Sequence, residues 1–297
     1  MGSIGTSLED LDTKLNLLYY GKPGTGKTTG ALTLSQRGKV LLINAEAGAK
    51  KQALTQHGVS AKNVEVWPPK DKGPGHITYE TLEAEVFEPL LDGAAADFKG
   101  GIVIDSMTEL TRRLLDNVVE EASAKAAQRG KSRDKWQIDI ADYGVTSSQM
   151  RNVLRRFRDL NTHLVLTSLE RRDVDGESGS VAYGPAMSPA IANDTMGLVD
   201  VICFTSIEQI GEQTFYLGSV APIGVRQAKD RFGLLPRRMV DPTAERMVQY
   251  LDGKLTKEKD PLQLKAREAL AGVTTPSGKD TTAEETTVPE AEEPAEA

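Results

Sequence analysis

The feature that most constrains this chain is a nine-residue glycine-rich segment, Gly21-Lys22-Pro23-Gly24-Thr25-Gly26-Lys27-Thr28-Thr29. An apolar run at residues 15–20 predicts a buried strand before it, and residues 30–35 predict the start of a helix after it. Glycine at these positions lets consecutive backbone N–H groups turn inward on an anion, which side chains would block. A strand, this turn and a helix in succession predict a loop that binds phosphate.

Two side chains of the segment have specific expected roles. Lys27 should reach the β- and γ-phosphates of a nucleoside triphosphate, and the Thr28 hydroxyl should complete the oxygen shell of Mg²⁺. The helix that begins near Lys27 adds the positive end of its dipole. We therefore expect the segment from Gly21 to Thr29 to bind ATP together with Mg²⁺.

Composition places the chain among soluble globular proteins. Its 297 residues are 39% hydrophobic and 27% charged, which is typical of that class. No apolar run approaches the roughly 20 residues of a membrane span, and the first residues lack the pattern of a secretory signal. The lone cysteine, Cys203, lies in an apolar run and cannot form an internal disulfide. We expect a cytoplasmic protein without a membrane partner.

Apolar runs alternate with helical patterns along the chain, which predicts an α/β fold with a mostly parallel sheet and helices on both faces. The further strands are expected at residues 38–45, 63–67, 101–105, 163–168 and 199–204. Helices are expected at residues 80–91, 108–128 and 150–160. A polar loop is expected at residues 170–188, and two more strands near residues 214–217 and 224–228.

Four regions follow from these patterns. Residues 1–12 form a polar lead-in, 13–253 the nucleotide-binding core, 254–272 a C-terminal helix and 273–297 an acidic tail. The tail has almost no apolar content and is expected to be disordered. It carries seven acidic residues and no basic one from Asp280 onward, so the net charge of −7 leaves 36 acids against 36 bases elsewhere. The acidic balance therefore does not exclude a nucleic-acid partner for the core.

Two carboxylates are the candidates for metal binding and water activation. Asp105 ends the apolar strand Ile102-Val-Ile-Asp and is expected to bind Mg²⁺ through a bound water beside the phosphate loop. Hydrolysis also needs a group that orients or deprotonates the attacking water. Residue 106 is Ser, whereas Glu46 follows the strand Leu42-Ile43-Asn44-Ala45 and can supply that carboxylate. The alternative for Glu46 is an exposed loop acid without a role.

This order of elements resembles the core of RecA-type recombinases from Leu15 to Leu251. It is similar in particular to compact phage RecA-like proteins of the AAA/RecA family that are linked to single-strand annealing and recombination. The segments Tyr183-Gly-Pro-Ala-Met-Ser-Pro and Leu198-Val-Asp also resemble that phage group. The resemblance implies a RecA-like P-loop NTPase core.

The resemblance further implies a γ-phosphate sensor at Thr167 or Ser168, the alternative being a plain strand-end hydroxyl. It implies two loops that contact single-stranded DNA, with Trp136 or Tyr183 stacking on bases. The alternative is a pair of solvated loops with packed aromatic rings. The basic candidates for the DNA contact are Arg129, Lys131, Arg133 and Lys135 in the first loop, and Arg171 and Arg172 in the second.

The segment Lys229-Asp230-Arg231-Phe-Gly233 resembles the K-x-R-x-G element through which ring helicases reach the γ-phosphate of a neighbouring subunit. A cation supplied in trans stabilises charge on the transferred phosphoryl group and makes hydrolysis depend on assembly. The resemblance therefore implies a homo-oligomer, as a ring or filament. A surface ion-pair cluster with Asp230 is the alternative.

Together these features predict an ATP-binding and ATP-hydrolysing RecA-like protein that acts on single-stranded DNA in phage recombination, annealing or replication. A DNA helicase or helicase-loader motor, and an ATP-gated DNA-binding module with little turnover, are the alternatives. A small-molecule kinase is disfavoured because the chain lacks an Arg-rich lid. The acidic tail could compete with DNA for the basic loops, recruit a protein partner, or only increase solubility.

Overall fold

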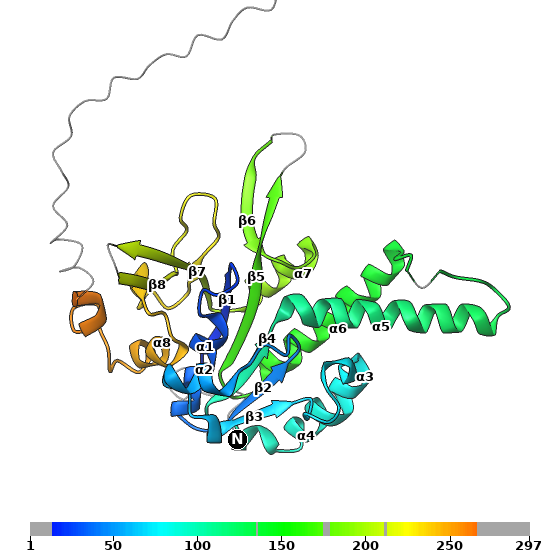
Figure 1. Ribbon diagram of the computed structural model, residues 1–297, viewed down its shortest axis with the longest axis horizontal. Helices are drawn as coiled ribbons and strands as arrows, with labels where there is room; N and C mark the ends of the chain where they lie inside the picture. Colours follow the sequence, from blue (N-terminus) through cyan, green and yellow to red (C-terminus); the bar gives the residue numbers. More distant parts are fainter. Residues whose placement is uncertain (1–13, 135, 175–178, 211–212, 266–297) are drawn as a thin grey trace, which may run out of the picture.

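A computed structural model describes residues 14–134, 136–174, 179–210 and 213–265. Figure 1 shows one twisted sheet with helices packed on both faces, and two narrow projections that extend from it. The strands of the sheet lie in the order β10-β8-β7-β1-β5-β4-β2-β3. Their bounds are β1 Asn16–Gly21, β2 Val40–Asn44, β3 Val64–Trp67, β4 Gly101–Asp105, β5 Leu164–Val174, β7 Val201–Ile210, β8 Gln213–Ser219 and β10 Arg238–Val240.

The six strands from β7 to β3 in this order are parallel, while β8 and β10 pair antiparallel at one side. Strand β5 therefore lies between β1, which precedes the phosphate loop, and β4, which ends at Asp105. Because the strands are parallel, their carboxyl ends meet along one edge of the sheet. The α/β architecture expected from the sequence is confirmed.

Both faces of the central strands are buried, which explains why these strands are continuous apolar runs in the sequence. In β1, Leu18 and Tyr20 pack into one hydrophobic cluster, and Leu17 and Tyr19 pack into the other. The first cluster is covered by α5, α6 and α7, and the second by α1 and α8. The helix bounds are α1 Lys27–Leu32, α5 Met107–Gln128, α6 Ile140–Asp159, α7 Pro189–Leu198 and α8 Ala244–Leu251.

Shorter helical segments connect the sheet strands. Helix α2 is Lys51–Gln56, and a π-helical turn at Glu83–Phe87 joins α3 Tyr79–Leu82 to α4 Glu88–Leu91. Short 3₁₀ turns lie at Thr33–Gln36, Ala61–Asn63, Pro74–His76 and Ala94–Asp97. No helix of the described residues is both long enough and apolar enough to span a membrane.

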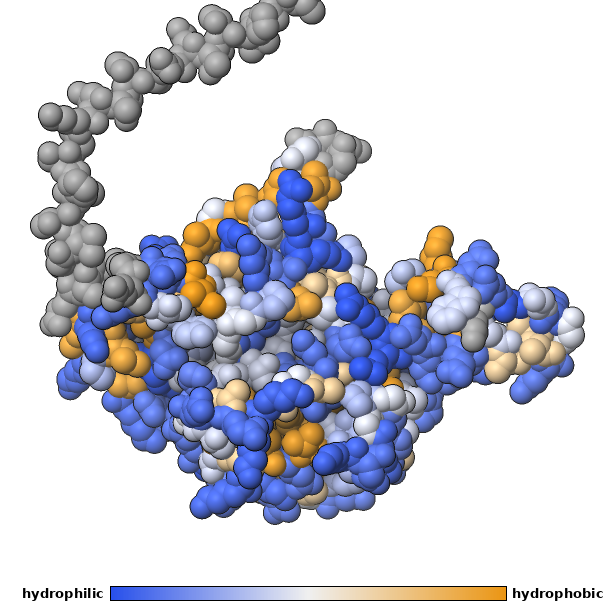
Figure 2. Space-filling model, in the orientation of Figure 1, coloured by the Kyte–Doolittle hydropathy of each residue, from blue (hydrophilic) through white to orange (hydrophobic). Residues whose placement is uncertain are grey.

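Two projections extend from the core (Figure 1). The first is the outer part of the antiparallel pair α5 and α6, and the second is a β-hairpin in which β5 pairs with β6, Val181–Pro185. Figure 2 shows apolar side chains on the outer part of the helical projection. Ile138, just before α6, and Ile140, Tyr143 and Val145, at its start, are 42–91% exposed.

Two of the differences from the sequence-based expectation concern strands. Residues 170–174 and 181–185 form this hairpin where a loop is expected, because exposed charged residues such as Arg172 and Asp173 conceal the strand pattern. Residues 224–228 form only isolated bridges, since Pro222 and the left-handed Gly224, with φ of 55°, interrupt a strand. Pairing resumes at β9, Lys229–Asp230, which lies against β7.

The predicted C-terminal helix is described only at its start. Residues 261–265 are helical, and the Asp260 carboxylate accepts a hydrogen bond of 3.0 Å from the Leu262 N–H. This contact caps the amino end of the helix. The lead-in, the rest of this helix and the acidic tail lie outside the described residues, so the predicted domain boundaries there stay predictions.

Candidate nucleotide-binding site

The phosphate loop connects β1 to α1, and its glycines adopt backbone conformations that other residues avoid. Gly24 and Gly26 have φ angles of 80° and 84°, in the left-handed region that glycine enters without strain. Gly21 meets a second requirement, because a Cβ there would lie 2.4 Å from the Thr205 carbonyl oxygen of β7. The loop is also tied to β7 by a 2.7 Å hydrogen bond between the Thr25 and Thr205 hydroxyls.

Lys27 is the first residue of α1, and its side chain turns back over the loop. Its ammonium donates to the carbonyl oxygens of Gly21 and Lys22 at 3.0 and 2.8 Å. Burial lowers the pKa of Lys27, against the opposing attraction of Asp105 and Glu46. The chain thus holds a partly desolvated cation at the position where the sequence predicts the phosphates.

Thr28 and Asp105, the two residues predicted to bind Mg²⁺, lie within hydrogen-bond distance of each other. The Thr28 hydroxyl lies 3.0 Å from both carboxylate oxygens of Asp105, and the Thr167 hydroxyl donates to one of them at 2.5 Å. Asp105 is 2% exposed, and this burial raises its pKa although the two hydroxyl donors lower it. Hydroxyl and carboxylate oxygens are the ligands that Mg²⁺ prefers, so this pair fits the ion directly or through water.

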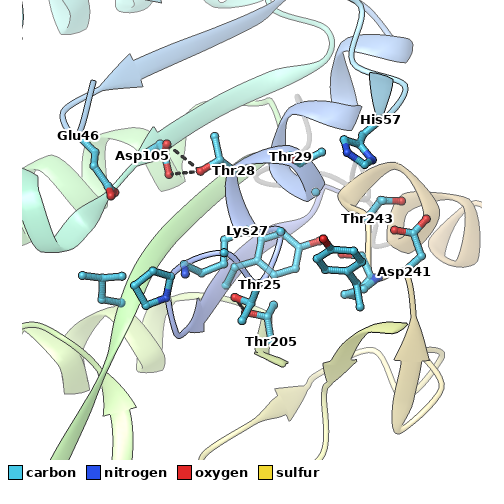
Figure 3. A pocket seen from close by; sticks show the side chains of 18 residues that line it. Thr25, Lys27, Thr28, Thr29, Glu46, His57, Asp105, Thr205, Asp241 and Thr243 are labelled. Atoms are coloured by element: carbon cyan, nitrogen blue, oxygen red, sulfur yellow. Dashed lines mark hydrogen bonds between the residues drawn. The ribbon is translucent and has the colours of Figure 1, made fainter. Parts of the chain in front are cut away.

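Glu46 is held beside Asp105 by its backbone. Its N–H donates to the Asp105 carbonyl oxygen at 3.0 Å, and the Arg113 guanidinium donates to the preceding Ala45 carbonyl at 2.9 Å. Figure 3 shows the Glu46 and Asp105 carboxylates next to each other, on the side of Thr28 away from Asp241 and Thr243. The Glu46 side chain is exposed to the cavity. It can therefore reach a water molecule there without breaking an internal ion pair.

These groups line one cavity of about 530 Å³ at the carboxyl edge of the sheet. Its lining includes every residue from Pro23 to Gly30, together with Glu46 and Asp105. The further lining residues that were not predicted from the sequence include His57, Thr205, Tyr216, Asp241 and Thr243. No local motif marks them, because they come from distant parts of the chain that only the fold brings together.

A family model described as an AAA domain (AAA_24) matches residues 13–232, which include the phosphate loop and Asp105. The chain belongs to this AAA domain family. No curated protein matches its sequence. Among solved structures 289 chains match, one of them in the crystal structure of the RadB recombinase. That match has 14% identity and a TM-score of 0.45, and it covers 76% of this chain and 86% of that chain.

The two sensor candidates of this AAA-domain protein point in opposite directions, as neighbours on a strand do. Thr167 faces Asp105. The Ser168 hydroxyl lies 3.0 Å from the Thr108 hydroxyl and accepts a hydrogen bond from the Ala186 N–H. Thr167 therefore lies next to the predicted metal position, whereas Ser168 connects β5 to α5. A sensor role for either residue stays a prediction.

The predicted trans-acting element lies far from the AAA domain's own cavity. Lys229 is in β9, which pairs with Val201 and Ile202 at the amino end of β7, whereas the phosphate loop is level with Thr205. Lys229 pairs with Ile202, so three residues of strand separate these levels by about 10 Å. The Lys229 ammonium donates to the Met196 carbonyl at 2.5 Å, at the end of α7.

Arg231 is bound to the same helix end. Its guanidinium pairs with the Asp200 carboxylate at 3.0 Å and donates to the Gly197 carbonyl at 3.1 Å. The ion pair therefore forms with Asp200, while Asp230 accepts hydrogen bonds from backbone N–H groups. The side chain of Arg231 is still 56% exposed. The trans role of Lys229 and Arg231 stays a prediction.

The DNA-contact candidates lie on the two projections of the AAA domain. Arg129 and Lys131 are exposed just after α5, whereas Arg133 pairs with Asp139 at 3.1 Å and also with Asp142. Arg171 pairs with Asp173, and Arg172 lies on the same strand. Trp136 is 81% exposed, and the Arg226 guanidinium stacks 4.6 Å from the centre of the Tyr183 ring. Lys135 lies outside the described residues.

Proposed function

We propose that this AAA-domain protein binds and hydrolyses ATP with Mg²⁺, and that it does so as an oligomer acting on single-stranded DNA. The observation that carries the proposal is the convergence of Lys27, Thr28, Asp105 and Glu46 on one cavity at the phosphate loop. The phage setting, in recombination, annealing or replication in the host cytoplasm, rests on the sequence resemblance.

Each group has a distinct role in the proposed reaction. Lys27 exchanges its two backbone carbonyl partners for phosphate oxygens and stabilises negative charge on them. Thr28 and Asp105 hold Mg²⁺, which supplies charge neutralisation when bound. Glu46 orients the attacking water and accepts its proton, because its exposed carboxylate faces the cavity. Thr167 keeps the Asp105 carboxylate in place through its hydrogen bond.

Assembly would complete the site. Lys229 and Arg231 lie at the opposite edge of the sheet from the chain's own phosphate loop. They can act on a triphosphate only if it belongs to a neighbouring subunit. A head-to-tail contact that places one subunit's amino edge against the next subunit's cavity generates a ring or a filament.

Single-stranded DNA is the proposed substrate of the two projections. Exposed Arg129 and Lys131, together with the exposed Trp136 ring, combine positive charge with a stacking surface. Proteins that bind single strands without sequence preference combine these two features. Binding should therefore weaken as the salt concentration rises.

The test is ATP hydrolysis measured at several protein concentrations, with and without single-stranded DNA. We expect DNA to stimulate hydrolysis, the specific activity to rise with protein concentration, and Glu46→Gln to abolish turnover. Hydrolysis that depends on neither DNA nor protein concentration would support an ATPase but contradict the proposed DNA-dependent assembly. Retention of ATP without measurable turnover would favour the ATP-gated binding module.

A helicase or helicase-loader motor is the second candidate, supported by the position of Lys229 and Arg231 at an edge where a neighbour can use them. Unwinding of a forked duplex with one directional preference would favour the motor. Annealing of complementary strands without unwinding would favour the recombination role.

A further inference from the structure

The cavity extends beyond the phosphate loop into a chamber whose lining residues were not predicted from the sequence. Its wall is formed by Tyr216 of β8 and by the turn Asp241-Pro242-Thr243 between β10 and α8. Figure 3 shows Asp241 and Thr243 on the side of Lys27 away from Glu46 and Asp105. The chamber therefore lies at the end of the cavity opposite the proposed water-activating groups.

The turn is fixed before any ligand binds. The Asp241 N–H donates to the Tyr216 carbonyl at 2.7 Å, and the Thr243 N–H donates to the Asp241 carbonyl at 2.8 Å. The buried Tyr19 hydroxyl donates to the Pro242 carbonyl at 2.6 Å. Asp241 has a φ of 50°, in the left-handed region that Asp and Asn tolerate better than other non-glycine residues. These contacts fix the backbone of Asp241 at one position on the cavity wall.

The chamber directly adjoins the phosphate loop. A Cβ on Gly26 would lie 3.4 Å from the Tyr216 ring, and a Cβ on Gly30 would lie 3.3 Å from the Pro242 carbonyl. A nucleoside is covalently attached to the phosphate chain, so it must occupy space beside this loop. The Glu46 side of the cavity is assigned to the terminal phosphate and water, which leaves the Tyr216 side for the nucleoside.

Two side chains of the chamber suit a nucleobase. The Tyr216 ring is 39% exposed and offers a flat apolar face to a base. The Asp241 side chain is exposed, and its carboxylate has no hydrogen bond or ion pair among the described residues. The neighbouring Arg246 donates to the Asp241 carbonyl and pairs with Asp260. An ionised carboxylate only accepts hydrogen bonds, so its ligand must offer a donor.

We propose that Tyr216 and Asp241 form the nucleoside subsite, in which Tyr216 stacks on the base and Asp241 accepts a hydrogen bond from the 6-amino group of adenine. This assignment rests on the proposed ATP binding and names the residues that select adenine. The ribose hydroxyls are the other hydrogen-bond donors on the same ligand, so the experiment must separate base from sugar.

The test compares ATP with inosine triphosphate, which has a keto oxygen in place of the 6-amino group and a hydrogen on N1, with the sugar and the triphosphate unchanged. Equilibrium binding with Mg²⁺ should favour ATP about 10- to 100-fold in the unchanged protein, because a charged acceptor left facing a keto oxygen loses its partner. Asp241→Asn keeps the left-handed backbone and adds an amide donor that suits the keto oxygen. We expect it to bring the ratio to about 1 or to reverse it.

Tyr216→Ala tests the other half of the subsite. It should weaken the binding of ATP and of inosine triphosphate by the same factor, about 10-fold, because stacking does not distinguish the two bases. Asp116→Asn, an exposed change on α5, is the matched control and should leave both affinities unchanged.

Two results would overturn the assignment. One is an ATP to inosine triphosphate ratio that Asp241→Asn leaves as it was. The other is an effect of Asp241→Asn on the discrimination against 2′-deoxy-ATP alone, which would assign the carboxylate to the ribose. Failure of the proposed function is distinguishable from both, because then the unchanged protein would bind neither triphosphate.

Discussion

The two edges of the parallel sheet differ in how they use their charged side chains. At the carboxyl edge, Lys27, Asp105 and Glu46 face a common cavity, and Glu46 and Asp105 have no ion-pair partner among the described residues. At the amino edge, Lys14 donates to the Arg158 carbonyl and to the Leu160 carbonyl, the latter at 2.6 Å, and Arg231 pairs with its own chain.

The difference separates groups that stabilise the fold from groups kept for a ligand. Burial lowers the pKa of Lys27 and raises that of Asp105, so the folded protein disfavours the charge on both. Such groups cost stability in the free protein, and that cost is characteristic of functional sites. At the amino edge, Lys14, Lys229 and Arg231 are bound to carbonyl or carboxylate oxygens, whereas at the carboxyl edge the carboxylates of Asp105 and Glu46 have no ion-pair partner among the described residues. Arg231 is the exception to test, since it is both paired and predicted to act on a neighbour.

The largest expected effect is on Arg231. If Arg231 acts in trans, Arg231→Ala should reduce DNA-stimulated hydrolysis about 10³-fold or more. Arg238→Ala is the control, because Arg238 is similarly exposed and pairs with Glu208 of β7. If Arg231 only caps α7, hydrolysis would survive and only the thermal midpoint would fall.

Mixing variants sharpens this test. Arg231→Ala subunits keep Glu46, and Glu46→Gln subunits keep Arg231. If the site is shared, an equal mixture of the two inactive variants should regain about a quarter of the full activity. Random assembly places a subunit with Glu46 next to a neighbour that supplies Arg231 at about a quarter of the interfaces. A mixture as inactive as its components would contradict shared sites.

Glu46→Gln alone should reduce hydrolysis about 10²- to 10⁴-fold, the usual contribution of a general base. ATP binding should persist, since Gln keeps the size of the side chain and the backbone bond to Asp105 remains. Single-turnover hydrolysis measured beside equilibrium ATP binding separates the two steps. Glu65→Gln, an exposed acid paired with Lys39, should change neither quantity.

Sequence reasoning located the groups whose neighbours in the chain define them. Gly21 to Thr29 form a contiguous motif, and Asp105 ends a recognisable strand, so local pattern was sufficient for them. Tyr216 and Asp241 lie roughly 190 and 210 residues after the phosphate loop, and only the pairing of β7 with β8 and of β8 with β10 brings them to it. The β5–β6 hairpin was missed because its two strands are solvent-exposed and carry charged residues.

Lysines on the two edges offer a direct contrast. Lys27→Ala should weaken ATP binding roughly 100-fold, because the charged contact to phosphate is lost. Its effect on the free energy of unfolding should match that of Lys14→Ala, about 1–3 kcal/mol, because each change removes an ammonium that donates to two backbone carbonyls and whose pKa is lowered by burial. Lys14→Ala should leave ATP affinity unchanged. Nucleotide titration and urea unfolding of both variants measure the contrast, and an equal loss of ATP affinity in the two variants would refute it.

The smallest expected effect concerns His163, which lies at the amino edge just before β5. Burial lowers the pKa of His163 from 6.5 to about 4, and its Nδ1 accepts a hydrogen bond of 3.0 Å from the Leu15 N–H. Between pH 6.5 and 4 the unfolded chain therefore binds a proton that the folded chain rejects, so stability falls as the pH falls through this window.

From pH 7 to pH 5 this one residue should account for about 2 kcal/mol of the free energy of unfolding. His163→Asn offers Leu15 an uncharged acceptor and does not titrate, so urea unfolding of the variant should lack that loss. Other titrating groups change both proteins equally, so the difference between the two pH profiles isolates the residue. Parallel profiles would show that the folded protein accommodates a charged His163. They would also contradict the conclusion that the polar groups at the amino edge serve only to stabilise the fold.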